Sequence, residues 1–262
     1  MTPPTTTPLT GRTALVTGGT RGIGHAIAKR LAQAGADLVI TGRSRTHGQA
    51  ALADLGDRAV FVCADATRRP DAERAVEDAL THFGRLDILV NNVGGATGFG
   101  TVAELSDTDW HDTLAANLDP MFYTTRRALP ELVRADGGRI INVSSIEGKH
   151  ADPGLAAYAA AKHAVIGFTK SLAREVGPLG ITANCLCPGM VVTDWIEQQG
   201  PHAAAAVGIS YEQLIGAFTQ RTALGRLTTC EEVADVALFL ATPGAAGVTG
   251  VAWSVDGGSA DH

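Results

Sequence analysis

Apolar and polar residues alternate in blocks along almost the whole chain, and each block has the length of one strand or one helix. Short, continuously apolar runs predict strands that are buried on both faces. Longer stretches follow them in which apolar residues recur every three or four positions, as at Ile23, Ile27 and Leu31, and these predict amphipathic helices. The strands are expected at residues 13–17, 37–41, 59–63, 86–91, 139–143, 181–186 and 251–255, and the helices at 22–35, 47–55, 70–83, 107–134, 157–175 and 231–240.

The order of these elements predicts the fold. Strands that alternate with helices are typical of a parallel sheet that helices cover on both faces. We therefore predict an α/β fold with a doubly wound parallel sheet, in a single domain over residues 10–262. Residues 1–9 (MTPPTTTPL) are rich in proline and threonine and are predicted to form a disordered tail. Residues 190–222 interrupt the alternation, and we interpret them as a substrate lid, with a surface insertion that has no role as the alternative.

Composition and charge narrow the function classes. Hydrophobic residues make up 45% of the chain and charged residues 18%, which allows a sizeable core. The formal net charge of −6 argues against broad binding to nucleic acid or to anionic membranes. No apolar run has the length of a transmembrane helix, and the N-terminus lacks the basic and apolar regions of a signal peptide. The four cysteines lack the spacing of a metal site, so we predict reduced thiols, no metal and a cytoplasmic location.

One pair of residues carries the candidate chemistry. Tyr158 and Lys162 are four positions apart in a predicted helix, so their side chains lie on the same face. A tyrosine has an ordinary pKa of about 10, and a neighbouring cation favours the phenolate and lowers that pKa. Ser145, thirteen residues before Tyr158, could hold a carbonyl oxygen beside the phenol. Together these side chains predict reduction of a ketone or oxidation of an alcohol, although the spacing alone also fits a surface tyrosine and a solvated lysine.

A glycine-rich loop predicts the cofactor. The first predicted strand leads directly into TGGTRGIG (residues 17–24), and a helix follows. Glycines permit a tight turn and the close approach of a pyrophosphate, and the helix N-terminus offers free N–H groups to that phosphate. The loop therefore indicates a dinucleotide, and its position between a strand and a helix makes it more specific than glycines alone.

The end of the second predicted strand distinguishes NADP from NAD. An NAD site usually has an acidic residue there, which binds the ribose hydroxyls. This chain has Gly42, Arg43 and Ser44 instead, and Asp37 lies at the opposite end of the strand. The guanidinium of Arg43, and that of Arg21 in the glycine loop, suit a 2′-phosphate because they are planar and always charged. We therefore predict NADP (NADPH), with NAD as the less favoured cofactor and solvated loop arginines as the alternative.

Further motifs occur in an order that resembles the short-chain dehydrogenase/reductase family, in its single-domain form with a Rossmann-type sheet. The resemblance extends over about residues 9–258. It includes the glycine loop, the acid of VCADAT (residues 62–67) and NNVG (residues 91–94), in which Val93 replaces the usual alanine. The cofactor-binding residues that it implies are Gly18, Thr20, Arg21, Gly22, Ile23, Gly24, Arg43, Asp65, Ala66, Asn92, Gly94, Tyr158, Lys162, Pro188, Gly189, Val191 and Thr193.

The same resemblance implies a catalytic role for four residues. Tyr158 would exchange a proton with the substrate oxygen, and Ser145 would orient and polarise that oxygen. Lys162 would lower the pKa of Tyr158 and bind the nicotinamide ribose, and Asn117 would hold a water that connects Lys162 to solvent. Ser144 is a rival of Ser145, but the spacing to Tyr158 favours Ser145, and neighbours on an extended segment point in opposite directions.

The substrate and the assembly are inferred by resemblance. The C-terminal part, from GRLTTCEEVADV (residues 225–236) onward, is similar to 3-oxoacyl-carrier-protein reductases, and the stretch around Tyr158 is also similar to aromatic-polyketide ketoreductases and hydroxyacid dehydrogenases. We therefore predict a 3-oxoacyl or polyketide-like ketone. The alternatives are an NAD-dependent hydroxyacid or secondary-alcohol dehydrogenase, a non-catalytic NADP-binding redox sensor, and a sugar-nucleotide epimerase, which would need a longer chain. The helices at 107–134 and 157–175 match a subunit interface of the family, which implies a homotetramer or homodimer.

The walls of the substrate site are expected in residues 95–101 and 146–154 and in the predicted lid. Glu147 and His150, next to Ser145, are expected either to contact a polar substrate or to be solvated. The lid has enough apolar surface to cover a substrate of moderate size, or alternatively to pack as core. Its large apolar residues are Trp195, Ile196, Tyr211, Leu214 and Phe218.

Overall fold

Seven parallel strands form one sheet in the part of the chain that the computed structural model describes, which is residues 7–193, 196–197, 200–201, 204–205 and 208–260. The strands are β1 (Thr13–Val16), β2 (Asp37–Gly42), β3 (Ala59–Cys63), β4 (Ile88–Asn91), β5 (Arg139–Val143), β6 (Thr182–Pro188) and β7 (Ala252–Val255). Their order is β3-β2-β1-β4-β5-β6-β7, and every pair is parallel. β1, β4, β5 and β6 are buried along their whole length.

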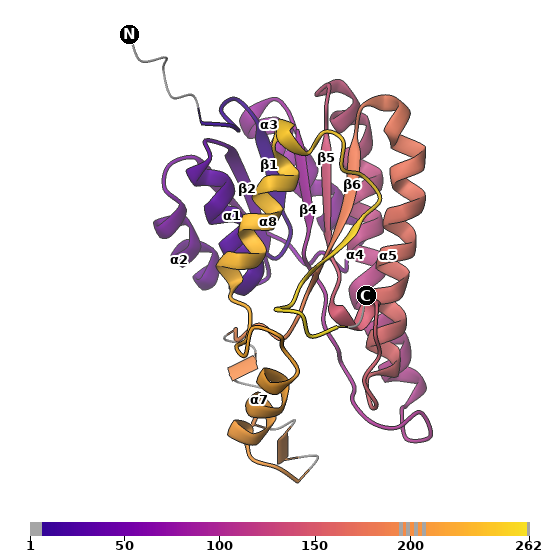
Figure 1. The fold of residues 1–262 in the computed structure, drawn as a ribbon. Coiled ribbons are helices and arrows are strands. Elements are labelled where there is room, and N and C mark those ends of the chain that lie inside the picture. The colour runs from indigo at the N-terminus through magenta and orange to yellow at the C-terminus, as the bar shows by residue number, and fades with distance from the viewer. Residues whose placement is uncertain (1–6, 194–195, 198–199, 202–203, 206–207, 261–262) are drawn as a thin grey trace.

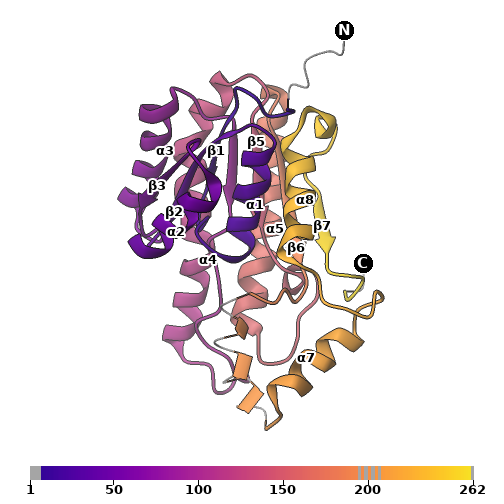
Figure 2. The ribbon, with the colours of Figure 1, turned by 90° about the vertical axis from the view of Figure 1, so that its left-hand side faces the viewer.

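The helices cover the two faces of the sheet in separate groups. One face carries α1 (Gly22–Gln33), α2 (Arg45–Leu55) and α8 (Cys230–Ala241), and the other carries α3 (Arg69–Phe83), α4 (Asp107–Arg134) and α5 (Ala156–Val176) (Figure 1, Figure 2). The predicted α/β fold with a doubly wound parallel sheet is thus confirmed, and each predicted strand or helix ends within two residues of the observed one. None of the helices in the described part of the chain has the length and apolarity needed to cross a bilayer.

Between β1 and β4, the direction in which successive strands are added across the sheet reverses. β2 and β3 extend the sheet on one side of β1, and β4 to β7 extend it on the other. In doubly wound sheets, ligands bind at the carboxyl ends of the strands at this point. The loops after β1 and β4 meet there, because Thr17 N donates to Val90 O and Asn92 N donates to Thr17 Oγ1, both at 3.0 Å. α7 (Tyr211–Gln220) lies beyond the same edge of the sheet (Figure 1).

The N-terminal tail is shorter than the sequence predicts. Leu9 is 1% exposed, packs into the core that contains α1, and donates its N–H to Ala34 O at 2.9 Å. The predicted end of the disordered tail at residue 9 is therefore wrong. A single leucine among prolines and threonines has no periodicity that marks it as core. Residues 1–6 of the predicted tail lie outside the described residues.

Candidate active site

The glycine-rich loop (residues 17–24) connects β1 to α1 in a tight turn. Gly18 and Gly22 have φ values of +64° and +55°, a conformation that residues with a side chain rarely adopt. A side chain at Gly24 would collide with the Gly18 carbonyl and with Asn92. Arg21 is the N-cap of α1, and its own side chain makes no capping hydrogen bond, so the N–H groups of the first turn suit a phosphate.

The end of β2 adjoins the glycine loop. A Cβ at Gly42 would lie 2.8 Å from Thr20 Cγ2, which shows how closely the two segments pack. The guanidinium groups of Arg21 and Arg43 are exposed, and within the described ranges neither has a hydrogen bond or ion pair. Asp37 is at the far end of β2 and pairs with Arg58 at 3.6 Å. Among the described residues, the segment at this end of β2 thus offers two cations that have no partner.

The segment after β3 reaches the same edge of the sheet. Asp65 is half-buried, and its carboxylate accepts from Thr67 N at 3.1 Å and from Thr67 Oγ1 at 2.7 Å. Its backbone N donates to the Asp71 carboxylate at 2.9 Å, and Ala66 beside it is 6% exposed. These bonds fix the backbone of the turn that the sequence assigns to the adenine end of the cofactor.

The loop after β4 brings Gly94 against two of the predicted catalytic residues. A Cβ at Gly94 would collide with Asn117 Oδ1 and lie 3.0 Å from Lys162 Nζ. Asn117, on α4, is 2% exposed. Its Nδ2 donates to Gly95 O and Thr113 O, both at 2.7 Å, and its Oδ1 accepts from Gly95 N at 3.1 Å. Asn117 therefore fixes this loop directly beside Lys162.

The two serines after β5 have different surroundings. Ser144 is 4% exposed, and its Oγ donates to Lys162 O at 2.9 Å, so it ties β5 to α5. Ser145 is half-buried, accepts from Glu147 N at 3.2 Å and is hydrogen-bonded to Tyr158. Of the two rivals, Ser145 is therefore the one that lies beside the phenol.

The electrostatics of Tyr158 and Lys162 differ from the sequence-based expectation. Burial raises the pKa of Tyr158 to about 12, and Glu147 raises it too, although the bond to Ser145 lowers it. Burial lowers the pKa of Lys162 to about 8. Lys162 Nζ donates to Val143 O at 3.1 Å and lies 5.5 Å from the centre of the Tyr158 ring. The prediction that Lys162 brings the Tyr158 pKa below its ordinary value is wrong for this structure, because burial outweighs it.

The segment after β6 closes the other side of the glycine loop. Gly189 follows Pro188 and packs so tightly that a Cβ there would lie 2.9 Å from Asp256. Val191 is 5% exposed and forms a parallel bridge with Thr228. The segment then reaches Thr193, whose Cγ2 would be 3.4 Å from a Cβ at Gly22. The structure thus brings the predicted cofactor-binding residues of five loops, those after β1, β2, β3, β4 and β6, to one edge of the sheet.

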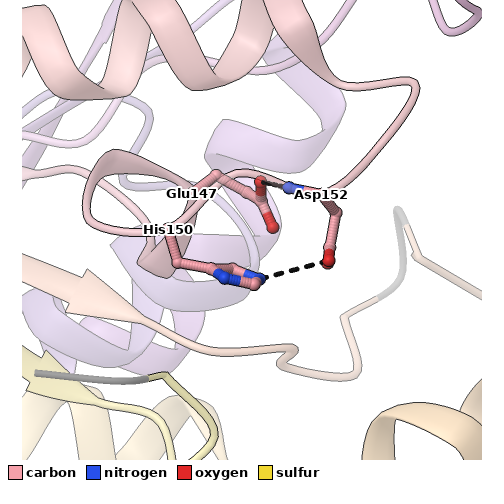
Figure 3. Close-up of side chains that lie close together, drawn as sticks. All are labelled: Glu147, His150 and Asp152. Atoms are coloured by element: carbon pink, nitrogen blue, oxygen red, sulfur yellow. Dashed lines mark hydrogen bonds and ion pairs between the residues drawn. The ribbon is translucent and has the colours of Figure 1, made fainter.

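The sequence did not predict a charged cluster beside Ser145. The side chains of Glu147, His150 and Asp152 converge, and one potential metal-ligand atom of each lies within 4.8 Å of the others (Figure 3). Arg221, directly after α7, lies 2.7 Å from Asp152 and 2.6 Å from His150 Nε2. Glu147 is buried rather than solvated. Adjacent charges in the sequence signal part of this cluster, but the pairing with Arg221 joins residues far apart in the chain.

The predicted lid is only partly described. On α7, Tyr211, Leu214 and Phe218 are half-exposed, and none of the residues of this helix is buried. Ile196 is also half-exposed, whereas Trp195 lies outside the described residues. These apolar side chains form no core of their own, so the alternative that they pack as core has no support on α7.

Comparison with known proteins gives a consistent result. The model of the short chain dehydrogenase family matches residues 12–204. D-beta-hydroxybutyrate dehydrogenase of Cupriavidus necator is 39% identical over 254 residues, which are 95% of this chain and 98% of the relative. Two solved structures are also similar. Actinorhodin polyketide ketoreductase with NADPH has a TM-score of 0.91 and 36% identity, over 96% of this chain and 98% of the other. The 3-ketoacyl-(acyl-carrier-protein) reductase of Brucella melitensis with NADH has a TM-score of 0.86 and 32% identity, over 97% and 100%.

Proposed function

The chain belongs to the short-chain dehydrogenase family and is an oxidoreductase that acts on a ketone or a hydroxyl group, and we propose that it is an NADPH-dependent carbonyl reductase. The observation that supports this most is the hydrogen-bonded pair of Ser145 and Tyr158 beside the buried Lys162 ammonium. A carbonyl oxygen between the hydroxyl and the phenol receives two hydrogen bonds. These bonds polarise the carbonyl carbon toward a hydride.

Tyr158 acts as the general acid in reduction. Its phenol gives a proton to the carbonyl oxygen while the carbonyl carbon gains a hydride, so that the C=O double bond becomes a C–OH group. A bound nicotinamide supplies the hydride. Because the pKa of Tyr158 is about 12, the phenol carries its proton at neutral pH. Lys162, whose pKa is about 8, returns a proton to the phenolate, and Asn117 holds the water that connects Lys162 to solvent.

NADPH is the proposed cofactor, held along the edge formed by the five loops. The glycine loop receives the pyrophosphate, Asp65 and Ala66 border the adenine, and Asn92, Gly94 and the segment after β6 border the nicotinamide. The support for NADPH over NADH is the pair of guanidinium groups at Arg21 and Arg43, which have no partner among the described residues. The two similar structures hold NADPH and NADH respectively, so they leave both cofactors in the family.

The proposed substrate is a 3-oxoacyl or polyketide-like ketone. The exposed apolar residues near the open edge of the site suit a substrate of moderate size; among them are Phe99 (57% exposed) and Val102 (75% exposed). The similarity to D-beta-hydroxybutyrate dehydrogenase favours a second candidate, an NAD-dependent hydroxyacid dehydrogenase. A non-catalytic NADP-binding sensor would not need the Ser145–Tyr158 pair. A homotetramer or homodimer and a cytoplasmic location stay predictions from resemblance.

A panel of ketones, 3-oxoesters and acyl thioesters, tested with NADPH and with NADH, examines this proposal. Consumption of NADPH with 3-oxoesters or thioesters, faster than consumption of NADH, is the expected result. Turnover of hydroxyacids with NAD alone would favour the second candidate, and no turnover with any compound would favour the sensor.

A further inference from the structure

A buried carboxylate lies two residues after Ser145. Glu147 belongs to η1 (Ile146–Gly148), which packs against α5, and is 5% exposed. Its backbone N donates to Ser145 Oγ at 3.2 Å, and its carboxylate accepts from Asp152 N at 2.9 Å. These two bonds fix the backbone and the side chain of Glu147 in the loop that follows Ser145. Burial of a carboxylate is costly, so stability alone does not explain it.

The guanidinium of Arg221 is already engaged by two other residues of this cluster. Arg221 bonds to Asp152 at 2.7 Å and to His150 Nε2 at 2.6 Å, and no hydrogen bond between it and Glu147 occurs within the described residues. His150 Nε2 also lies 3.1 Å from the Asp152 carboxylate, so the imidazole sits between that carboxylate and the guanidinium. The cluster contains two carboxylates, those of Glu147 and Asp152 (Figure 3), and one permanent cation, the guanidinium of Arg221.

Two nearby lysines do not neutralise Glu147 either. Lys149 Nζ donates to Ser254 Oγ at 2.8 Å, which directs it toward β7. Lys162 Nζ donates to Val143 O at 3.1 Å on the other side of the tyrosine. Within the described residues, neither lysine therefore has a hydrogen bond to Glu147.

The influence of Glu147 reaches the reacting group. Burial is the main cause that raises the pKa of Tyr158, and the charge of Glu147 raises it further. Burial raises the pKa of Glu147 as well, and the like charge of Asp152 raises it further. A second anion brought to the Ser145–Tyr158 pair would be repelled for the same reason.

We propose that Glu147 is a specificity-determining residue that excludes substrates with a free carboxylate next to the reacting carbonyl and favours uncharged esters and thioesters of 3-oxoacids. This inference rests on the proposed carbonyl reduction and selects among its substrates. The fixed carboxylate acts as a repulsive element, which discriminates between compounds of similar size more effectively than added contacts. It predicts that a free 3-oxoacid, which resembles the product of the hydroxybutyrate relative, is a poor substrate of this chain.

The test compares acetoacetate with methyl acetoacetate, which have the same reacting ketone and differ by one charge. We measure kcat/KM for both with NADPH in the wild-type enzyme, in Glu147→Gln and in Glu147→Asp. Glu104→Gln is the matched control, because Glu104 is an exposed acid whose partner is Thr101. Binding of both compounds to the NADP complex, measured by calorimetry, gives the same comparison without turnover.

The wild type is expected to prefer the ester by about tenfold or more, the effect of a like charge in the site. Glu147→Gln should reduce this preference by about tenfold, whereas Glu147→Asp and Glu104→Gln should keep it. Equal use or equal binding of the two compounds by the wild type overturns the inference, as does an unchanged preference in Glu147→Gln. Failure to reduce any ketone would instead contradict the proposed function, and the binding comparison would still decide the inference.

Discussion

Arg221 and Asp152 form an ion pair at 2.7 Å that joins the end of α7 to the loop between Ser145 and Tyr158. Burial raises the pKa of the Asp152 carboxyl, but the hydrogen bond from Arg221 lowers it. The net pKa of Asp152 lies below its ordinary value. The backbone N of Asp152 bonds to Glu147, and the backbone N of Glu147 bonds to Ser145 Oγ. A continuous set of contacts therefore connects α7 to the hydroxyl of the site.

Arg221→Ala should weaken substrate binding more than catalysis. Because no residue of α7 is buried, the position of this helix depends on few contacts, and loss of this one should raise KM for the ketone by about three- to tenfold. kcat should change less, and the free energy of unfolding should fall by less than about 1 kcal/mol, since the pair is partly exposed. Steady-state kinetics and chemical denaturation measure both.

Arg226→Ala is the matched control for Arg221→Ala. Arg226 forms an ion pair of similar length with Glu232, at 2.6 Å, but that pair lies at the start of α8 and not on the loop of Ser145. Its removal should leave KM for the ketone unchanged. A similar rise of KM in both variants would mean that Arg221 has no specific role in positioning α7.

Lys162→Met should stabilise the protein below pH 8 and inactivate it. Lys162 has a folded-state pKa of about 8 against an ordinary 10.5, so between these values the unfolded chain binds more protons than the folded one. Burial of the charged lysine therefore costs stability below pH 8, by about 3 kcal/mol, and this cost disappears as the pH rises through 10.5. Loss of the hydrogen bond to Val143 O offsets part of the gain in the variant.

Urea denaturation at several pH values checks this prediction. The difference in free energy of unfolding between Lys162→Met and the wild type should shrink as the pH rises from 8 to 10.5. Lys170→Met, an exposed lysine of the same helix, should show no such dependence. A difference that grows with pH would contradict the lowered pKa of Lys162.

Arg43→Ala should raise KM for NADPH and leave KM for NADH unchanged. A hydrogen bond from a guanidinium to a phosphate contributes about 1.5–3 kcal/mol, so KM for NADPH should rise by about tenfold to a hundredfold. Arg58→Ala removes an exposed arginine that pairs with Asp37, at the other end of β2, and should leave both cofactors unaffected. Equal rises of KM for NADPH and NADH in Arg43→Ala would show that Arg43 does not bind the 2′-phosphate.

The fold was predictable because its signals are local. Continuous apolar runs mark the buried strands, and residues such as Ile27 and Leu31 recur with the helical period and are fully buried. The distinction between Ser144 and Ser145 was also local, since neighbouring side chains on an extended segment point in opposite directions. Leu9 was missed because one apolar residue has no period.

The features that the sequence did not predict depend on contacts between distant residues. The pairing of Arg221 with Asp152 and His150 has no signal in spacing, because α7 and the loop before α5 meet only in the folded chain. The shift in the pKa of Tyr158 was predicted in the wrong direction. The spacing to Lys162 shows the nearby cation but not the burial of the phenol, which raises the pKa. Burial of Glu147 was missed for the same reason.

The measurement that tests the account most directly is kcat/KM for NADPH-dependent reduction of a 3-oxoester by the wild type and by Tyr158→Phe. Tyr158→Phe keeps the ring and removes the proton that goes to the carbonyl oxygen, so kcat should fall by about 10²–10⁴-fold or more while NADPH still binds. Tyr123→Phe, a tyrosine of α4 outside the site, should keep full activity. Most of the wild-type activity retained in Tyr158→Phe would contradict proton transfer by Tyr158.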